Sequence, residues 1–356
     1  MIGIALLTLV PGVVGGSETY ARGLTAALAR VGTLEYEALL PPLAADADGG
    51  LPSRIASAYP PARTAPERLR AMATAMLAPS RLRAELGFER LDAVHYPLTV
   101  RVPPSDGTPT VVTALDVQHL LHPRFFSPAE RAYRRLAYER SFRSARLVIA
   151  ISEHVGRSLV ERSGVDPELV RVVPLGVDHT RFRPGDEPRE PFLLYPANPW
   201  PHKNHRRLLD AFALLREDRP ELQLVLTGAG HSRTRPQPGV VVRGHVSQDE
   251  LVRLYRTASA LVYPSLYQGC GRPVLEAIAC GCPVAAATSG SLPEVCGDAA
   301  RLFDPTSPEA IAEAVADLLA RPEPFVERGL ARAARFTWDE CARRHERVYL
   351  EAIEGA

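Results

Sequence analysis

Residues 260–284 read ALVYPSLYQGCGRPVLEAIACGCPV, and this stretch contains the repeating unit of the fold. An apolar run ends at Tyr263, a loop rich in glycine follows, and a helix-period stretch begins at Pro273. Gly281 suits the end of that helix, and another apolar run starts near Val284. The order strand, loop, helix, strand is typical of a parallel sheet wrapped by helices.

The same alternation extends along most of the chain in two series. Strands are expected at residues 2–10, 34–40, 93–95, 110–114, 147–150, 170–173, 192–195, 223–227, 240–243, 260–263 and 284–286. Helices are expected at residues 17–29, 66–86 with a break at Pro79, 128–142, 153–163, 204–215, 248–257, 273–280, 308–320 and 338–353. Residues 180–191 hold three prolines and are expected to form a linker between the series.

A chain of 356 residues exceeds one ordinary domain of about 100 to 200 residues. The two series therefore predict an α/β protein with two doubly wound, Rossmann-like domains, residues 1–180 and 181–337, facing across a cleft. In such sheets ligands bind outside the carboxyl ends of the strands. Loops that follow strands are the places to look for chemistry.

Charge and composition exclude several classes of function. Lys+Arg 42 against Asp+Glu 41 gives a net charge of +1, so no overall field gathers nucleic acid or anionic lipid. The sequence has no apolar run of about 18 residues, and its start, 1–7, reads as a first strand rather than a signal peptide. We expect a cytoplasmic protein whose 5 cysteines stay reduced.

One compositional feature singles out a site. Lys203 is the single lysine of the chain, and the only two asparagines, Asn198 and Asn204, flank it. An ammonium group can follow a phosphate as a compact charge, and Asn204 is placed to cap the next helix. The segment 198–204 is therefore the first candidate for an anion site, against the alternative of an ordinary surface loop.

Two further loops have the composition of anion sites. The loop 11–18 contains Gly15 and Gly16 before a helix that Ser17 is expected to cap, although it matches neither GxGxxG nor a P-loop. In the loop after Tyr263, the amides of Gly271 and Arg272 at a helix start are expected to face a phosphate.

Taken in order, these motifs resemble the retaining glycosyltransferases of family 4, which have the GT-B fold. The resemblance rests on the Gly-Gly loop, on Tyr-Pro and His-Lys-Asn opening the second series, on PSLYQGCGRPVLEA, and on GSLPEVCGDAA, and it extends from Gly15 to the helix with Trp338. It implies that residues 1–180 bind the acceptor and 181–337 the nucleotide sugar. It also implies that the last helix, 338–356, crosses back onto the first domain.

The resemblance assigns roles by position. The residues implied in donor binding are Gly15, Gly16, Asn198, Lys203, Gly244, His245, Val246, Gln268, Gly269, Cys270, Gly271, Arg272 and Glu276. Those implied in catalysis are Lys203, His119, Asp116 and Gln268. Lys203 neutralises the leaving diphosphate, Glu276 holds the ribose hydroxyls and residues 244–246 meet the base, while His119 faces the transferred sugar.

Three positions depart from the family pattern. Gln268 stands where the family has Glu and supplies no negative charge near a developing oxocarbenium ion. Asn198 replaces a frequent Arg, so that Lys203 lacks its usual partner unless Arg272 reaches the phosphates. Leu115 replaces the His expected before Asp116.

The expected reaction moves a sugar from a nucleotide sugar, GDP-mannose or a UDP-sugar, to a hydroxyl of a glycan, lipid-linked or small-molecule acceptor. No cofactor or metal is expected, because Lys203 and helix-terminal amides stabilise the diphosphate and the histidines offer no credible ligand set. No nucleic-acid partner is expected, and membrane contact is at most peripheral, at the inner face of the membrane. The oligomeric state is left open.

Two other functions remain as alternatives. A non-hydrolysing nucleotide-sugar epimerase shares this architecture but needs acid/base carboxylates of which this chain has few. A nucleotide-sugar-binding protein with weak or lost turnover is compatible with the three departures. Release of nucleoside diphosphate from a donor panel separates such a binding protein from a transferase.

Overall fold

The protein is described by a computed structural model over residues 1–13, 15–231 and 237–355. Its chain divides into two compact units, which we describe one by one. Unit 1 comprises Met1–Gly176 and Trp338–Ala356, and unit 2 comprises Val177–Thr337. The observed division falls four residues before the boundary expected at residue 180, near the start of the expected linker.

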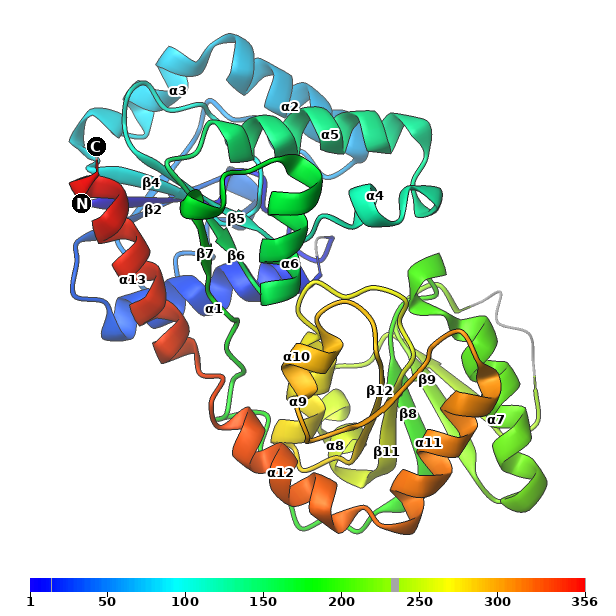
Figure 1. Ribbon diagram of the computed structural model, residues 1–356. Helices are drawn as coiled ribbons and strands as arrows, with labels where there is room; N and C mark the ends of the chain where they lie inside the picture. Colours follow the sequence, from blue (N-terminus) through cyan, green and yellow to red (C-terminus); the bar gives the residue numbers. More distant parts are fainter. Residues whose placement is uncertain (14, 232–236, 356) are drawn as a thin grey trace. The chain divides into compact units, whose positions relative to one another are not determined.

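Unit 1 is built on a parallel sheet in the order β3-β2-β1-β4-β5-β6-β7 (Figure 1). Its strands are β1 (Ile2–Ala5), β2 (Tyr36–Leu40), β3 (Ser53–Ile55), β4 (Ala93–Tyr96), β5 (Thr110–Ala114), β6 (Leu147–Ala150) and β7 (Val170–Val172). Ile2 pairs with Tyr36 on one side and Ala93 on the other. The strand order therefore reverses between β1 and β4, where doubly wound sheets bind ligands.

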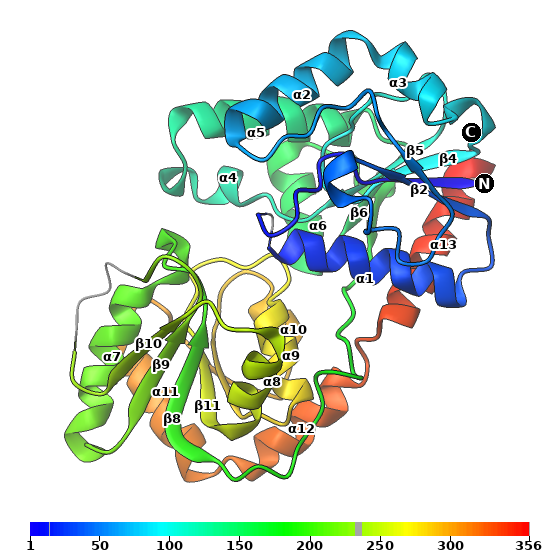
Figure 2. The ribbon, with the colours of Figure 1, turned by 180° about the vertical axis from the view of Figure 1, so that it is seen from behind.

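The helices of unit 1 connect these strands, and the last one comes from the end of the chain. They are α1 (Gly16–Val31), α2 (Ala65–Leu77), α3 (Pro79–Glu85), α4 (Gln118–Leu121), α5 (Pro128–Arg143), α6 (Glu153–Ser158) and α13 (Trp338–Glu354). Short turns are η1 (Pro42–Ala44), η2 (Phe88–Arg90), η3 (Pro123–Phe125), η4 (Leu159–Ser163, a π-helical turn) and η5 (Pro167–Leu169). Helix α13 lies beside α1 and against β4 and β5 (Figure 2).

Polar side chains fasten α13 to the sheet of unit 1. His95 on β4 shares hydrogen bonds with Tyr349 of α13 (2.8 Å) and with Thr113 (2.8 Å). Tyr20 of α1 shares hydrogen bonds with Thr113 (2.9 Å) and with His345 (2.9 Å). Burial lowers the pKa of His345 to about 4, so both histidines stay neutral in the folded state.

Unit 2 has a second parallel sheet in the order β10-β9-β8-β11-β12-β13. Its strands are β8 (Glu190–Pro196), β9 (Gln223–Thr227), β10 (Val240–Gly244), β11 (Ala258–Tyr263), β12 (Val284–Ala287) and β13 (Arg301–Phe303). The reversal of strand order lies between β8 and β11, which pair in parallel with Leu194 beside Leu261. Together the two sheets confirm the predicted α/β fold class.

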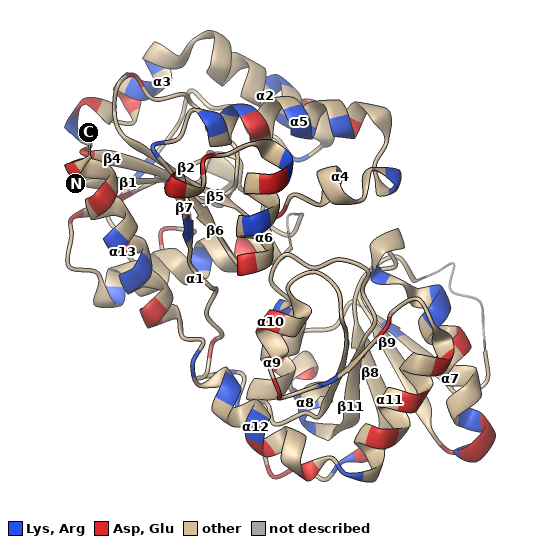
Figure 3. Cartoon of the chain, viewed as in Figure 1, with Lys and Arg blue, Asp and Glu red and all other residues tan. Residues whose placement is uncertain are grey.

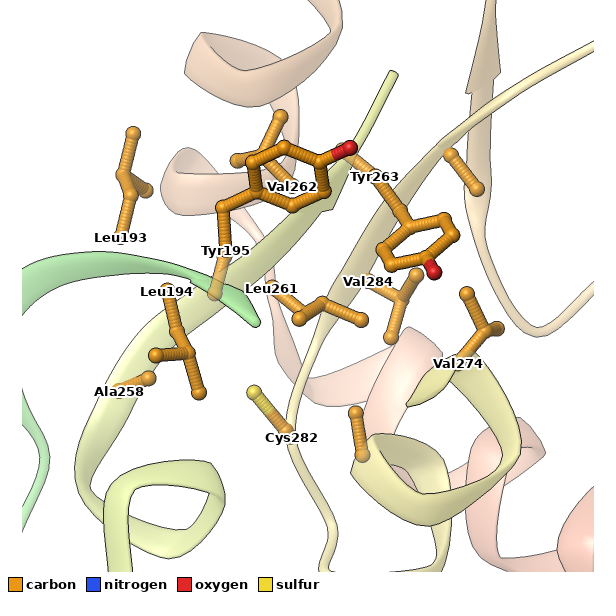
Figure 4. Packing of buried hydrophobic residues seen from close by; sticks show 14 of the residues in the cluster. Leu193, Leu194, Tyr195, Ala258, Leu261, Val262, Tyr263, Val274, Cys282 and Val284 are labelled. Atoms are coloured by element: carbon orange, nitrogen blue, oxygen red, sulfur yellow. The ribbon is translucent and has the colours of Figure 1, made fainter. Parts of the chain in front are cut away.

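Helices surround the second sheet. They are α7 (His205–Asp218), α8 (Gln248–Thr257), α9 (Arg272–Ala279), α10 (Leu292–Cys296), α11 (Pro308–Ala320) and α12 (Glu323–Ala333), with the turn η6 (Pro201–Lys203). The core between them contains apolar side chains from β8, β11, β12 and α9, and the buried Tyr195 and Tyr263 are part of it (Figure 4). A rigid core fixes where the loops after β8 and β11 begin.

The expected elements are found with small shifts of their ends, and several short ones were missed. The first strand ends at Ala5 rather than at residue 10, and the predicted break at Pro79 separates α2 from α3. The short strands β3 and β13 and the helices α4, α10 and α12 were not predicted. Four of these elements have only three to five residues, too few to carry a periodic pattern, whereas α12 has 11 residues and was overlooked.

Acidic and basic residues are interspersed along α5 and α13 (Figure 3). Arg143 pairs with Glu139 (3.3 Å) on α5, and Arg344 pairs with Glu340 (2.8 Å) on α13. Such exposed pairs contribute little stability and mark solvated helix faces. Within the described ranges, no helix combines the length and the apolar character needed to cross a membrane.

Candidate functional site

Lys203 lies at the carboxyl edge of the unit 2 sheet, in the turn between β8 and α7. Its ammonium Nζ donates a hydrogen bond to the hydroxyl of Tyr263 (3.2 Å) and lies 5.4 Å from the centre of that ring. The hydroxyl of Tyr195 donates to the carbonyl oxygen of Lys203 (2.5 Å). Two tyrosines near the ends of neighbouring strands thus hold the lysine where the strand order reverses.

The charge of Lys203 lacks a counterion. Within residues 1–13, 15–231 and 237–355 it forms no ion pair with a carboxylate, and its charged neighbour is Arg272. Burial and, to a lesser degree, the Arg272 guanidinium lower the pKa of Lys203 to about 7. A partly buried cation beside a second cation is an arrangement that an anionic ligand would stabilise.

Arg272 and Glu276 lie one turn apart at the start of α9. Gly271 precedes the helix with a φ of 68°, the left-handed region that favours glycine, so the chain turns sharply into α9. Arg272 pairs with Glu276 (3.3 Å), and the Tyr255 hydroxyl donates to the other carboxylate oxygen (3.0 Å). Glu276 is 4% exposed, and burial raises the pKa of its carboxyl group.

The side chains of the two asparagines form hydrogen bonds with backbone groups. Asn204 precedes α7 with a φ of 61°, but its side chain makes no capping hydrogen bond. Its amide donates instead to the carbonyls of Pro264 (3.0 Å) and Pro305 (2.7 Å), so Asn204 occupies the expected N-cap position without the expected capping hydrogen bond. The Asn198 side-chain oxygen accepts from the Ala229 amide (2.8 Å) and joins the loops after β8 and β9.

Gln268 is held from both sides. Its side-chain amide donates to the hydroxyl of Ser265 (3.1 Å), and its backbone carbonyl oxygen accepts from the backbone amide of Ser291 (3.1 Å). A Cβ added to Gly290 would lie 2.6 Å from the Gln268 carbonyl oxygen, so only glycine permits this approach. The segment around residues 289–291 therefore fixes the loop that contains Gln268, Gly269 and Cys270.

The remaining predicted donor residues lie at the end of β10. Gly244 has a φ of 65°, and its carbonyl oxygen accepts from the Gly228 amide (2.7 Å). The His245 side chain is exposed, whereas Val246 packs against the core of unit 2. The backbone after β10 thus runs beside the loop after β9.

In unit 1, the Gly-Gly loop follows β1 and contains Val14, which lies outside the described residues. Gly15 precedes α1 with a φ of 53°, and its carbonyl oxygen accepts from the Glu18 amide (3.0 Å). The expected cap Ser17 is wrong, because Ser17 already lies inside α1. A Cβ on Gly15 or Gly16 would meet nothing within 4 Å, so space is open above both glycines.

Asp116 and His119 follow β5 in unit 1. The Asp116 carboxylate accepts from the Gln118 amide (3.1 Å) and pairs with Arg134 (3.3 Å). His119 is 4% exposed and meets the Tyr138 ring edge-on at 5.5 Å. Both ring nitrogens lack a hydrogen-bond partner among the described residues, and burial lowers the pKa of the imidazole. Because buried polar groups are normally hydrogen-bonded, a ligand or a water molecule is the expected hydrogen-bond partner of this imidazole.

A cavity of about 520 Å³ opens in unit 1 at the carboxyl ends of β1, β2, β4 and β5. Asp116, Arg134 and Tyr138 line it, whereas His119 is not among its lining residues. Its volume is that of a small-molecule site.

The structure thus groups the predicted residues into two sets. Unit 2 brings Lys203 and Arg272 together and places Glu276 on Arg272, with Gln268 in the loop that leads into α9. Unit 1 holds Gly15, Gly16, Asp116 and His119. Tyr263, Tyr255, Ser265, Ser291 and Arg134 were not predicted as partners of these residues. The repeated Tyr-Pro after two apolar runs, at Tyr195 and Tyr263, was the signal for the tyrosine pair.

Metal-ligand chemistry has few candidates in the structure. The five cysteines are thiols rather than disulfides. Over the part of the chain that the structure describes, no three His, Cys, Asp or Glu side chains gather as a metal site would require.

Two curated relatives are similar in sequence. O-antigen chain mannosyltransferase B of Escherichia coli is 37% identical over 164 residues, which cover 42% of this chain and 43% of that protein. MMP alpha-(1->4)-mannosyltransferase of Mycolicibacterium hassiacum is 30% identical over 286 residues, covering 76% of this chain and 67% of that protein. The matched region thus spans between 43% and 67% of the length of these relatives.

A solved structure shares the fold over the whole chain. Sucrose-phosphate synthase from Thermosynechococcus elongatus superimposes with a TM-score of 0.77 at 19% identity, covering 100% of this chain and 99% of the other.

Two family models divide the sequence between them. Glycosyltransferase Family 4 matches residues 14–181, and Glycosyl transferases group 1 matches residues 177–333. They meet where unit 1 passes into unit 2. The chain belongs to the family 4 glycosyltransferases, which have the GT-B fold.

Proposed function

We propose that the protein transfers a sugar from a nucleotide sugar to a hydroxyl group of an acceptor, with retention of the anomeric configuration. The observation that carries the proposal is the environment of Lys203. This single lysine is partly buried, lies next to Arg272 and has no carboxylate partner among the described residues. A diphosphate supplies the negative charge that Lys203 lacks, since Arg272 already pairs with Glu276. The names of both curated relatives support a mannosyl donor such as GDP-mannose, and UDP-sugars are the second choice.

The donor residues divide by the part of the nucleotide sugar they hold. Lys203, Arg272 and the first-turn amides of α9 bind the diphosphate, because amides at a helix start have no acceptor within the helix. Glu276 accepts hydrogen bonds from the ribose hydroxyls. The backbone of residues 244–246 meets the base. Asn198 acts through the backbone of the neighbouring loop, consistent with its hydrogen bond to Ala229.

In the proposed reaction no side chain of the protein forms a covalent bond with the sugar. The acceptor oxygen bonds to the anomeric carbon on the face from which the diphosphate leaves, as the bond between that carbon and the phosphate oxygen breaks. The electron pair stays on the departing phosphate oxygen, which takes the proton of the acceptor hydroxyl. Lys203 and the α9 amides stabilise this charge where it develops, so the proposal needs no metal or cofactor. We place His119, Asp116 and the amides of Gly15 and Gly16 around the sugar.

One observation favours a second candidate, a nucleotide-sugar-binding protein with little turnover. Gln268 replaces the family carboxylate, and its amide is tied to Ser265 (3.1 Å). A neutral amide hydrogen-bonds sugar hydroxyls but adds no negative charge beside an oxocarbenium-like carbon. Binding of a donor without release of nucleoside diphosphate distinguishes this candidate.

The test is a donor panel read out as nucleoside diphosphate release. GDP-mannose and UDP-, ADP- and dTDP-sugars are incubated with the protein and candidate hydroxyl acceptors. We expect release with one donor class and a loss of about 100- to 1,000-fold in Lys203→Ala. The matched control is Arg206→Ala, an exposed cation in the first turn of α7. Equal turnover in Lys203→Ala removes that residue from the mechanism.

The cellular place of the reaction belongs to the same proposal. We place the protein in the cytoplasm, and at the inner face of the membrane when its acceptor is lipid-linked. Cell fractionation with and without the acceptor pathway tests this placement.

A further inference from the structure

The cavity of unit 1 has a lining in which apolar side chains predominate. It lies at the carboxyl ends of β1 and β4, where the order of the strands reverses, and has a volume of about 520 Å³. Leu43, Leu69 and Met72 are among its lining residues, together with three tyrosines. The surface offered to a ligand is therefore largely hydrocarbon and aromatic.

Several polar side chains of the cavity are engaged within the protein. Asp116 and Arg134 pair with each other (3.3 Å), and the Arg134 guanidinium also lies 4.6 Å from the centre of the Phe126 ring. Glu130 accepts hydrogen bonds from the amide and the hydroxyl of Ser127, both at 2.9 Å. The Tyr133 hydroxyl donates to the sulfur of Met72 (3.5 Å).

Side-chain amides, imidazoles and ammonium groups are missing from the described lining, whereas Arg68, Thr8 and Ser17 add polar groups to it. Among the described residues that line the cavity there is no Asn, Gln, His or Lys. Each hydroxyl group of a buried glycan needs a partner to offset the water that it loses, and the apolar side chains of the lining offer none. An apolar body gains from the same wall.

We propose that this cavity holds an amphipathic acceptor, whose apolar body lies against Leu69 and Met72 while its hydroxyl lies at the Asp116 end. The inference deepens the proposed transfer reaction and rests on it for the role of acceptor. The binding of an apolar body in the cavity can be measured whether or not the protein transfers a sugar. The acceptor class is thus a hydroxylated lipid or polycyclic molecule rather than a free glycan.

The direct experiment is calorimetric binding of n-alkyl β-glucosides, from butyl to octyl, with free glucose as the reference and without nucleotide. We expect affinity to rise about fourfold for each added methylene until the cavity is filled. Free glucose should show no measurable binding. Affinity that does not change with chain length, or a free trisaccharide that binds as tightly as the octyl glucoside, overturns the inference.

A pair of leucines on α2 supplies matched variants. Leu69 lines the cavity and is 53% exposed, whereas Leu77 is 87% exposed and is not among the lining residues. Both are exposed enough for Gln to be accepted without unfolding. We expect Leu69→Gln to weaken octyl glucoside binding about tenfold and Leu77→Gln to leave it unchanged. An equal effect of the two variants places the alkyl chain elsewhere and contradicts the inference.

Binding of GDP or UDP, measured in parallel, keeps the two proposals apart. Nucleotide binding without any alkyl glucoside binding refutes the amphipathic acceptor alone. Alkyl glucoside binding without nucleotide binding refutes the transferase and leaves the apolar character of the cavity standing.

Discussion

Binding of a nucleoside diphosphate should be coupled to uptake of a proton by Lys203. The lowering of its pKa from 10.5 to about 7 makes the charged ammonium less favourable by about 5 kcal/mol. At pH 8 only about a tenth of the unliganded protein then carries this charge. A bound diphosphate stabilises the ammonium and returns the pKa toward its ordinary value. Binding at pH 8 should therefore take up about 0.9 proton per site.

The sign of the pH dependence follows directly. Below pH 7 the ammonium is already formed, so pH has little effect through this group. Above pH 7 each binding event must first protonate Lys203, and the affinity should fall by up to about tenfold per pH unit. The second ionisation of a phosphate lies near pH 6 and contributes little at pH 8.

The assay is titration calorimetry with GDP and UDP at pH 8 in two buffers of different ionisation enthalpy. The difference in observed heat gives the number of protons taken up. Lys203→Arg keeps the charge at every pH and should show no uptake, and Lys203→Met should show none with weaker binding. Heats that do not depend on the buffer, or uptake that persists in Lys203→Arg, refute the reasoning about this lysine.

Three further outcomes are expected. His345 is neutral in the folded protein, where its pKa is about 4, whereas its pKa in the unfolded chain would be near 6.5. Its contribution to the free energy of unfolding, up to about 3 kcal/mol, is therefore present above pH 6.5 and is lost as the pH falls towards 4. Urea unfolding of the parent and of His345→Gln between pH 4.5 and 8 should show a shallower acid loss in the variant. Gly23→Ala should destabilise unit 1 by about 1 to 3 kcal/mol in thermal melts, because the new Cβ would lie 2.5 Å from the Trp338 ring, whereas Gly16→Ala meets no atom within 4 Å and serves as the comparison. Glu276→Gln should reduce the preference for GDP over 2′-deoxy-GDP, about 10-fold or more in the parent, in competition binding; an unchanged preference would remove Glu276 from the ribose.

The parts of the fold that the sequence predicts best are those with strong periodic or apolar signals. Residues 110–114, 147–150 and 223–227 were expected as strands and have those bounds in the structure. The break at Pro79 was also expected, because proline cannot continue the preceding turn of a helix. The short strands β3 and β13 depend on neighbours in the sheet rather than on their own residues.

The candidate site was predictable in its residues more than in its bonds. A lone lysine between two asparagines pointed to the loop after β8, but the sequence could not tell that Asn204 turns its side chain to Pro264 and Pro305. Those carbonyls lie about 60 and 100 residues away along the chain. Partners at such separation are fixed by tertiary packing, which no local pattern encodes.

Because helix α13 comes from the end of the chain, unit 1 cannot be completed until the rest of the protein has been synthesised. The ribosome completes residues 1–176 first, then the whole of unit 2, and only then makes the helix that covers Tyr20 and His95. At about 5 to 20 residues per second, the intervening stretch of roughly 160 residues leaves the earlier unit unfinished for about 10 to 30 s. Unit 1 is therefore translated first but completed last, and until α13 is made the surface around Tyr20 and His95 is available for chaperones to bind.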